Sequence, residues 1–316
     1  MMQISPEIQL FIREHSSDDV RVLALQAKKY PDIDMPTAIT QIAGRKVAAE
    51  KIPSWWEIEK IWYPKHLSLE QCSSEITARY KARLLQGDSL TDLTGGFGID
   101  CSFLATGFKS ATYVERQEEL CEIAAHNFPV LNLNHINIKN EEGVTYLQVM
   151  SPVDCLFLDP ARRNEHGGKT VAISDCEPNV AELEELLLQK ANRVMIKLSP
   201  MLDLSLALKE LKQTQEVHIL SVNNECKELL ILLGQTSPAE ISIHCVNLFT
   251  KGTQKEQHFV FTREQEQCSE CTYTDSLETY LYEPNASLLK AGAFRSIAAA
   301  YPVRKLHPNS HLYTSD

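Results

Sequence analysis

Two groups of residues in this chain have the types and the spacing to do chemistry, and each follows an expected buried strand. The first is Asp159-Pro160, with Arg162 and Arg163 close behind, after the apolar run "DCLFL". An acid in this position either caps the next turn or belongs to a site at the carboxyl edge of a sheet. The two arginines either form an internal salt bridge, for which the acids of "ISDCEP" are candidates, or hold a base or a phosphate.

The second group surrounds the glycine turn in "LTDLTGGFGID". Asp92 lies near the end of an expected strand, Gly95, Gly96 and Gly98 form the turn, and Glu115 ends the next strand, "ATYVE". Glycines in such a turn permit backbone torsions that other residues avoid, and they let a ligand approach the main chain. The acid on the second strand is at the distance expected of a ribose-binding residue. The pattern predicts a site for a nucleoside cofactor.

The spacing of the glycines helps to choose the cofactor. A dinucleotide fingerprint needs a third glycine, and Cys101 stands in its place, which disfavours a nicotinamide-dependent oxidoreductase. An acid such as Asp92 suits a ligand that carries an ammonium group better than it suits a pyrophosphate. S-adenosylmethionine has an ammonium, a sulfonium and a ribose, so it fits the set of acids best. Glu141 or Glu142, after the third expected strand, is a candidate to accept a hydrogen bond from the adenine amine.

The elements that must position these groups alternate between strand and helix. Apolar strands and amphipathic helices succeed one another from the glycine turn to about residue 234, which predicts a doubly wound, mostly parallel α/β sheet. Residues 241–249 and 257–264 predict an added hairpin. Ahead of the sheet, residues 67–86 predict one continuous helix that begins with a capping box of Ser68 and Gln71.

The first 65 residues predict short helices, and the three tryptophans cluster at their end. Trp55, Trp56 and Trp62 are interpreted as the apolar seal between this helical segment and its neighbour, with base stacking as the alternative. Ser73, Ser74 and Thr77, on the helix that leads into the glycine turn, either cap locally or contact the methionine end of the cofactor.

The order of "DLTGGFGID", "YVERQ", "DPARR" and "IKLSP" resembles that of the motifs in class I S-adenosylmethionine-dependent methyltransferases. Further stretches, including "EQCSSEITARYKA", "VNNECKELL" and "YEPNASLLKAGAF", are similar to a bacterial family of methyltransferases with a C-terminal ferredoxin-like and THUMP-like module. The resemblance covers nearly the whole chain. It implies the seven-strand methyltransferase fold, S-adenosylmethionine as cofactor and, through the THUMP association, an RNA substrate, either transfer or ribosomal RNA.

The same resemblance assigns "DPAR" to the place of [N/D]-P-P-[Y/F/W] in amino-group methyltransferases. It implies that Asp159 and Pro160 orient the acceptor, and that Arg162, which replaces an aromatic residue, anchors a base or phosphate. The motif is also similar to the D-P-P-R of enzymes that methylate pyrimidine carbon 5, but those need a cysteine after the following strand. The chain has Ser199 there, and Cys226 is the nearest substitute nucleophile.

Composition bears on the partners, the localisation and the metal content of the protein. The net charge of −11 argues against bulk coating of nucleic acid, although residues 285–315 carry lysines and arginines and no acid. Nine scattered cysteines fit a reducing cytosol better than a disulfide framework, so we expect a cytoplasmic protein with no membrane partner. Cys268 and Cys271 form a C-x-x-C without a second pair, so we expect no metal site.

We therefore predict a helical cap over residues 1–65, a class I methyltransferase domain over 66–265, and the start of a ferredoxin-like/THUMP-like module, which looks incomplete, over 266–316. The expected function is methylation of RNA. Two alternatives stay open: a methyltransferase that acts on a small molecule or a protein side chain, and a non-catalytic module that binds the cofactor or RNA.

Overall fold

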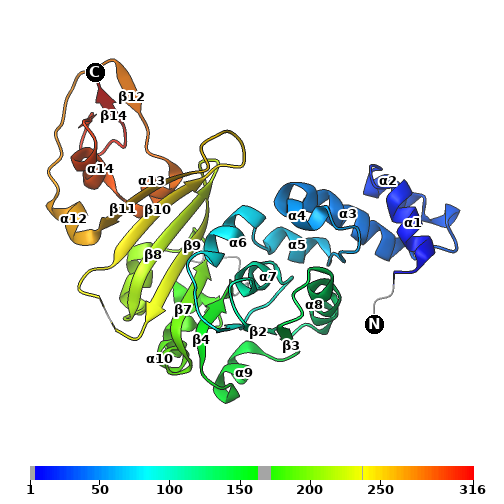
Figure 1. Cartoon of the computed structure of the whole chain (residues 1–316). Helices are drawn as coiled ribbons and strands as arrows, with labels where there is room; N and C mark the ends of the chain where they lie inside the picture. The colour runs from blue at the N-terminus through cyan, green and yellow to red at the C-terminus, as the bar shows by residue number, and fades with distance from the viewer. Residues whose placement is uncertain (1–3, 163–171, 237) are drawn as a thin grey trace. The chain divides into compact units, whose positions relative to one another are not determined.

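The computed structural model describes residues 4–162, 172–236 and 238–316, which form two compact units, Met1–Asp154 and Cys155–Asp316 (Figure 1). The strand β4 (Val153–Leu158) begins in the first unit and continues in the second.

The strands of the first unit are parallel and follow the order β4-β1-β2-β3. They are β1 (Ser89–Asp92), β2 (Ser110–Val114) and β3 (Ile136–Lys139), with the first residues of β4. The start of β4 is fixed beside β1 because the Asp154 carboxylate accepts hydrogen bonds from the backbone and the hydroxyl of Ser89, at 2.9 and 3.0 Å. The strands alternate with α7 (Ile99–Ala105), α8 (Glu118–Val130) and α9 (Gly143–Val149), as the sequence pattern predicts.

A helical segment precedes these strands (Figure 1). It contains α1 (Pro6–Glu14), α2 (Val20–Leu25), the short 3₁₀ turn Ala27–Lys29, α3 (Met35–Lys51), α4 (Pro53–Trp56), α5 (His66–Gln71) and α6 (Glu75–Ala82). The helices α1 and α2 pack on α3 around a small apolar cluster of their own, which includes Phe11, Leu23 and Ile42. Short helices at the start of the chain are thus confirmed.

The prediction of one continuous helix over residues 67–86 is wrong. The chain forms α5 and α6 with a break at 72–74, and the expected capping box of Ser68 and Gln71 does not form, since α5 begins at His66. Tertiary contacts explain the break. The Lys51 ammonium donates to the carbonyl oxygens of Leu69 and Glu70, at 2.9 and 2.5 Å, and so satisfies the end of α5.

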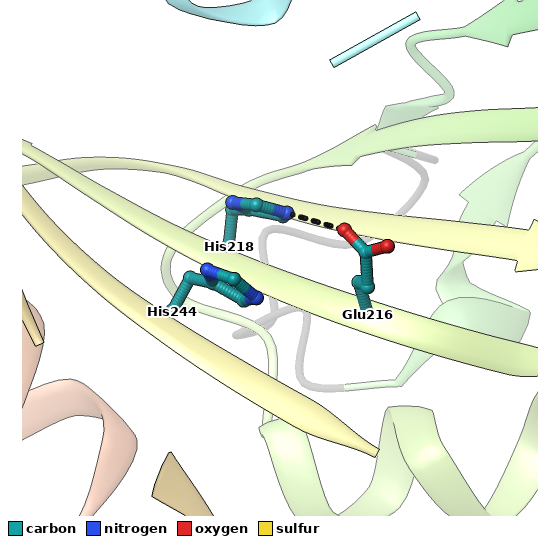
Figure 2. A group of neighbouring side chains, drawn as sticks. All are labelled: Glu216, His218 and His244. Carbon is teal, nitrogen blue, oxygen red and sulfur yellow. Dashed lines mark hydrogen bonds and ion pairs between the residues drawn. The ribbon is translucent and has the colours of Figure 1, made fainter. Parts of the chain in front are cut away.

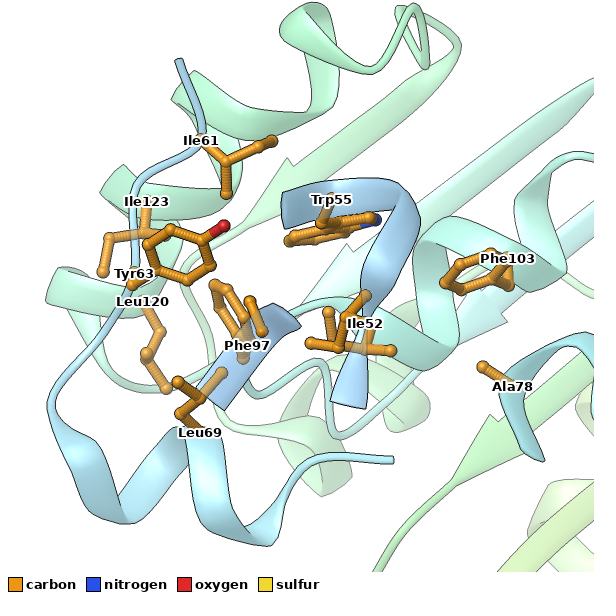
Figure 3. Close-up of a cluster of buried hydrophobic side chains, with 12 residues drawn as sticks. Ile52, Trp55, Ile61, Tyr63, Leu69, Ala78, Phe97, Phe103, Leu120 and Ile123 are labelled. Carbon is orange, nitrogen blue, oxygen red and sulfur yellow. The ribbon is translucent and has the colours of Figure 1, made fainter. Parts of the chain in front are cut away.

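The tryptophan cluster seals the helical segment against the glycine turn (Figure 3). Trp55 is buried, with its ring edge-on to that of Phe97 at 5.2 Å between centroids, and Phe97 lies inside the glycine turn. Trp62 stacks on His126 of α8, with centroids 3.8 Å apart. Trp56 is 42% exposed beside Arg45. The interpretation of the cluster as an apolar seal is confirmed for Trp55, whose ring lies inside the core shown in Figure 3.

The strands of the second unit follow the order β11-β10-β8-β9-β7-β4. They are β7 (Ala191–Leu198), β8 (Thr214–Val222), β9 (Glu225–Gly234), β10 (Ser242–Leu248) and β11 (Glu256–Thr262). β9 runs antiparallel to β7 and β8, while β10 is parallel to β8. The expected hairpin of β10 and β11 is confirmed. The helices α10 (Val180–Lys190) and α11 (Leu204–Glu210) lie between strands in the sequence, as the periodicity predicts.

The C-terminal residues form a small antiparallel sheet with three short helices. The sheet has the order β12-β14-β13, from Tyr280–Tyr282, Tyr313–Ser315 and Arg304–Lys305. The helices are α12 (Arg263–Cys268), α13 (Ala286–Ala291) and α14 (Phe294–Ala300). The Glu266 carboxylate accepts from the backbone nitrogens of Phe294, Arg295 and Ser296 and so caps α14. Among the described residues, no helix combines the length and the apolar character needed to cross a membrane.

The seal gives a stability prediction. Replacement of Trp55 by alanine removes a fully buried indole from the core, so we expect it to lower the free energy of unfolding by about 3–5 kcal/mol. Trp56→Ala is the matched control, because its ring is partly exposed, and it should cost less than about 1 kcal/mol. Urea titration followed by circular dichroism measures both. Equal losses in the two variants would contradict the assignment of Trp55 as the sealing residue.

Candidate active site

The glycine turn between β1 and α7 is shaped by one aromatic ring. A Cβ atom on Gly95 would lie 2.2 Å from the ring of Tyr113, which is buried on β2, so only glycine fits. Gly96 and Gly98 have φ of +54° and +87°, in the left-handed region that other residues avoid. The Tyr113 hydroxyl donates to the carbonyl oxygen of Gly96 at 2.5 Å. The turn predicted from the glycines is thus held by the strand beside it.

Glu115 follows β2, as predicted, and its carboxylate is bound to the same turn. One oxygen accepts from the backbone nitrogen of Gly96 at 2.9 Å, and the other from that of Gln117 at 2.8 Å. The residue is only 8% exposed, so these bonds fix the position of its charge. Each carboxylate oxygen can accept a second hydrogen bond, so ribose hydroxyls could still bind it. The structure therefore brings Glu115 together with Gly95, Gly96 and Tyr113.

Asp92 is the last residue of β1 and is buried, at 1% exposure. Its Oδ1 accepts from the backbone nitrogen of Thr94 at 2.9 Å, which starts the turn toward the glycines. Gly96 has open space on its far side: a Cβ there would meet nothing closer than the Thr94 carbonyl oxygen at 3.7 Å. Both polar main-chain groups of Gly96 are hydrogen-bonded, the nitrogen to Glu115 and the carbonyl oxygen to Tyr113, and contact of this turn with a ligand stays a prediction.

A buried charged group behind the turn was missed by sequence reasoning. Lys81 of α6 is fully buried, and its ammonium lies 2.9 Å from the Asp100 carboxylate of α7. Ser73 donates to the other Asp100 oxygen at 2.7 Å and accepts from Lys81 at 2.8 Å. Ser73 therefore joins this buried ion pair instead of capping a helix. Thr77 is also buried. The signal in the sequence was a lysine at a position that the helical periodicity directs toward the core, where an unpaired lysine is rare.

Two acids that follow β3, Glu141 and Glu142, are the candidates to bind adenine. Glu141 is exposed, between β3 and α9. Its neighbour Glu142 caps α9 by accepting from the backbone nitrogens of Val144 and Thr145, at 3.0 and 2.8 Å. These two hydrogen bonds, together with a third from the Thr145 hydroxyl, hold the pKa of Glu142 below its usual value against the opposing effect of burial. Contact between Glu141 and adenine stays a prediction.

The acceptor-site residues belong to the second unit. Asp159 follows β4, and its Oδ2 lies 2.5 Å from the ammonium of Lys197, near the end of β7. The Lys197 side chain is 9% exposed and that of Asp159 is 36% exposed. A lysine so deeply buried needs a nearby acid, so Asp159 neutralises it whatever else it does. The structure places the ammonium of a lysine beside this acid.

Pro160 is buried, and the next residues form a short antiparallel pair. In it, β5 (Ala161–Arg162) lies beside β6 (Cys176–Glu177), with Arg162 opposite Cys176. The side chain of Arg162 is not described, and Arg163 lies outside the described residues. Asp175, a candidate for their salt bridge, accepts from the backbone nitrogen of Ala172 at 3.2 Å. Roles for the two arginines therefore remain predictions.

Two weaker candidates lose support. Burial raises the pKa of Cys226, so its thiol is protonated at neutral pH and is a poor nucleophile.

The lysines and arginines of residues 285–315 already make internal contacts. Lys290 donates to the Leu202 carbonyl, Arg295 to that of Gln267, and Lys305 to that of Pro308. Arg304 pairs with Glu278. These contacts favour a structural role for the basic segment over a phosphate-binding face.

Comparison with known proteins gives the family. The crystal structure of a "putative methyltransferase" from Porphyromonas gingivalis W83 is 36% identical in sequence and matches 98% of this chain and 77% of that chain, with a TM-score of 0.84. The chain belongs to this methyltransferase family. A family model for a ferredoxin-like domain matches residues 280–316 of the present chain. These residues lie within the C-terminal module that the sequence predicts. No match is found among curated proteins.

More distant structures share only part of the chain. A "putative methyltransferase" from Streptococcus mutans in complex with SAH is 14% identical and covers 51% of this chain and 96% of its own, with a TM-score of 0.36. An rRNA methylase from Streptococcus thermophilus is 16% identical and covers 50% and 93%, also with a TM-score of 0.36. Scores this low carry no argument about this methyltransferase.

The Asp159–Lys197 pair gives a stability prediction. Asp159→Asn leaves Lys197 without its acid, so we expect a loss of about 1–3 kcal/mol in the free energy of unfolding, less than for a fully buried pair because Asp159 is partly exposed. Replacing both residues, with Lys197→Met beside Asp159→Asn, should restore most of that stability, since methionine suits the buried site. Urea titration of the two variants checks this. A double variant as unstable as the single one would contradict the pairing.

Proposed function

We propose that this methyltransferase uses S-adenosylmethionine as its methyl donor and that its acceptor is a base in RNA. The observation that carries the cofactor assignment is the position of Glu115. Two backbone nitrogens hold its carboxylate beside a glycine turn whose main chain has open space on one side. A buried acid at the end of the neighbouring strand, Asp92, adds a second negative group.

The chemistry of this donor set suits the cofactor. Carboxylates accept hydrogen bonds from ribose hydroxyls and from an ammonium group, and S-adenosylmethionine carries both. A pyrophosphate close to Asp92 would be repelled by the charge of that acid. In the place of the third glycine of a dinucleotide site stands Cys101, buried in α7. We assign Glu115 to the ribose and Asp92 to the methionine end.

When bound, S-adenosylmethionine supplies a methyl group that its positively charged sulfur has already activated. The protein therefore needs no strong base, and positioning of the acceptor supplies most of the rate. Asp159 would accept a hydrogen bond from an N–H group of the acceptor and so aim the nitrogen lone pair. Its charge is fixed in place by Lys197, at 2.5 Å. Pro160, buried next to it, limits the backbone freedom of the corner.

The choice of RNA rests on the resemblance to a family with a THUMP-like module, and "DPAR" is also similar to the acceptor motifs of base-modifying enzymes. Arg162 would hold the base or a phosphate beside Asp159. A small molecule or a protein side chain as acceptor is the competing outcome. The lysines and arginines of residues 285–315 make internal contacts, so we do not assign RNA binding to that segment.

The cofactor assignment is tested by direct binding. Calorimetric titration of the wild-type protein with S-adenosylmethionine should show one site. Glu115→Gln should weaken it by roughly 10- to 100-fold, the effect expected for loss of a hydrogen bond to a charged group. Glu118→Gln, an exposed acid at the start of α8, is the control and should bind as the wild type does. Equal affinity in the two variants would contradict the role of Glu115.

The acceptor is tested by transfer of a labelled methyl group. The protein is incubated with methyl-labelled S-adenosylmethionine and, separately, total RNA, protein extract and metabolite extract. We expect label in RNA, reduced at least roughly 100-fold in the Asp159→Asn/Lys197→Met double variant, which we expect to keep most of the stability of the wild type. Lys197→Met alone is the control that shows how much of the reduction comes from the change at Lys197. Label only in protein or metabolites would overturn the RNA assignment. No transfer into any pool, with binding intact, would favour a non-catalytic module.

A further inference from the structure

Three side chains of the second unit that the proposed methyl transfer does not use lie together on β8 and β10 (Figure 2). Glu216 and His218 are two residues apart on β8, so they share one face of the sheet, and His244 of β10 lies directly opposite His218. One ligand atom from each residue lies within 4.8 Å of the others. We propose that Glu216, His218 and His244 form a binding site for a zinc ion.

Hydrogen bonds already orient the three ligand groups. His218 Nε2 lies 3.2 Å from one oxygen of Glu216, as Figure 2 shows, while the other oxygen is held by Arg193 at 2.8 Å. His244 Nδ1 lies 3.0 Å from His258 Nε2. When Nδ1 donates that bond, the lone pair of His244 is on Nε2, the atom left to bind a metal. Metal-binding histidines commonly use their second ring nitrogen in this way.

The ligand types are those that zinc prefers. Two imidazoles and one carboxylate form a zinc set that leaves a fourth position open for water. A tetrahedral ion at the usual bond lengths would need ligand atoms about 3.3–3.6 Å apart. The rings of His218 and His244 are now stacked, with centroids 4.2 Å apart and planes 20° apart, so binding requires them to tilt toward a common point.

Solvent can reach this face of the sheet. His218 is buried, at 2% exposure, but Glu216 and His244 are half-buried and His258 is exposed. Side chains alternate along β11, so Phe259, whose ring centroid lies 6.2 Å from that of Tyr301, faces the other way from His258. The contact between Phe259 and Tyr301 therefore lies on the opposite face of the sheet from the histidines.

The test is zinc titration of the full chain after dialysis against a chelator. Calorimetry of the wild-type protein should show one zinc ion per chain. His244→Ala should weaken that binding at least tenfold, and Glu216→Gln, which keeps the side-chain size, should weaken it as well. His126→Ala removes a histidine outside the cluster and should leave the binding unchanged.

The C-x-x-C of Cys268 and Cys271 is the competing zinc ligand, so a Cys268→Ser/Cys271→Ser variant belongs to the same experiment. Binding that survives this double change and is lost in His244→Ala supports the proposal. Binding lost in the cysteine variant and unchanged in His244→Ala overturns it, as does the absence of one-to-one binding in the wild type.

Binding of cobalt in place of zinc gives a second readout. It uses only the wild-type protein, so it does not depend on the folding of any variant. The wild-type protein loaded with one equivalent of Co²⁺ should show the visible absorption of a four-coordinate ion. A charge-transfer band from thiolate to cobalt would place the ion on cysteine and overturn the histidine site. This readout and the calorimetry are independent of methyl transfer, so failure of the proposed function would leave the zinc result interpretable.

Discussion

The contact between Tyr113 and Gly95 is the constraint on which the first unit depends. The tyrosine ring fills the space where a Gly95 side chain would lie, and its hydroxyl binds the next carbonyl of the turn. Because the turn follows the ring so closely, Phe97 is carried to the position where it meets Trp55 of the helical segment. One packing contact thus fixes both the candidate cofactor turn and the core that holds the N-terminal helices in the same unit.

Buried charge is the second organising feature, and it is handled the same way in both units. Lys81 in the first unit and Lys197 in the second are almost completely buried, and each lies within ion-pair distance of an aspartate. Such pairs contribute little net stability relative to an apolar core, but losing one partner is costly. The acids are therefore held in fixed positions. For Asp159, this is the property that orientation of an acceptor requires.

The strand that carries Glu216 and His218 shows how a sheet can assemble a site from distant residues. His244 is 26 positions further along the chain than His218, but parallel pairing of β8 and β10 makes them direct neighbours. His258 joins them from β11 through the antiparallel hairpin. None of these residues forms a recognisable motif in the sequence. Their proximity is produced by strand register, which is set by the packing of both faces of the sheet.

The sequence by itself determined the order of strands and helices, the glycine turn, the position of Glu115 after its strand and the family resemblance, because these depend on local periodicity and on contiguous motifs. Tertiary structure decided the rest. It broke the expected helix at residues 72–74, because Lys51 satisfies the end of α5 and Ser73 joins a buried ion pair. It paired Asp159 with Lys197 and gathered the histidines, since contacts between residues far apart in the chain follow from register and burial, which no local pattern records.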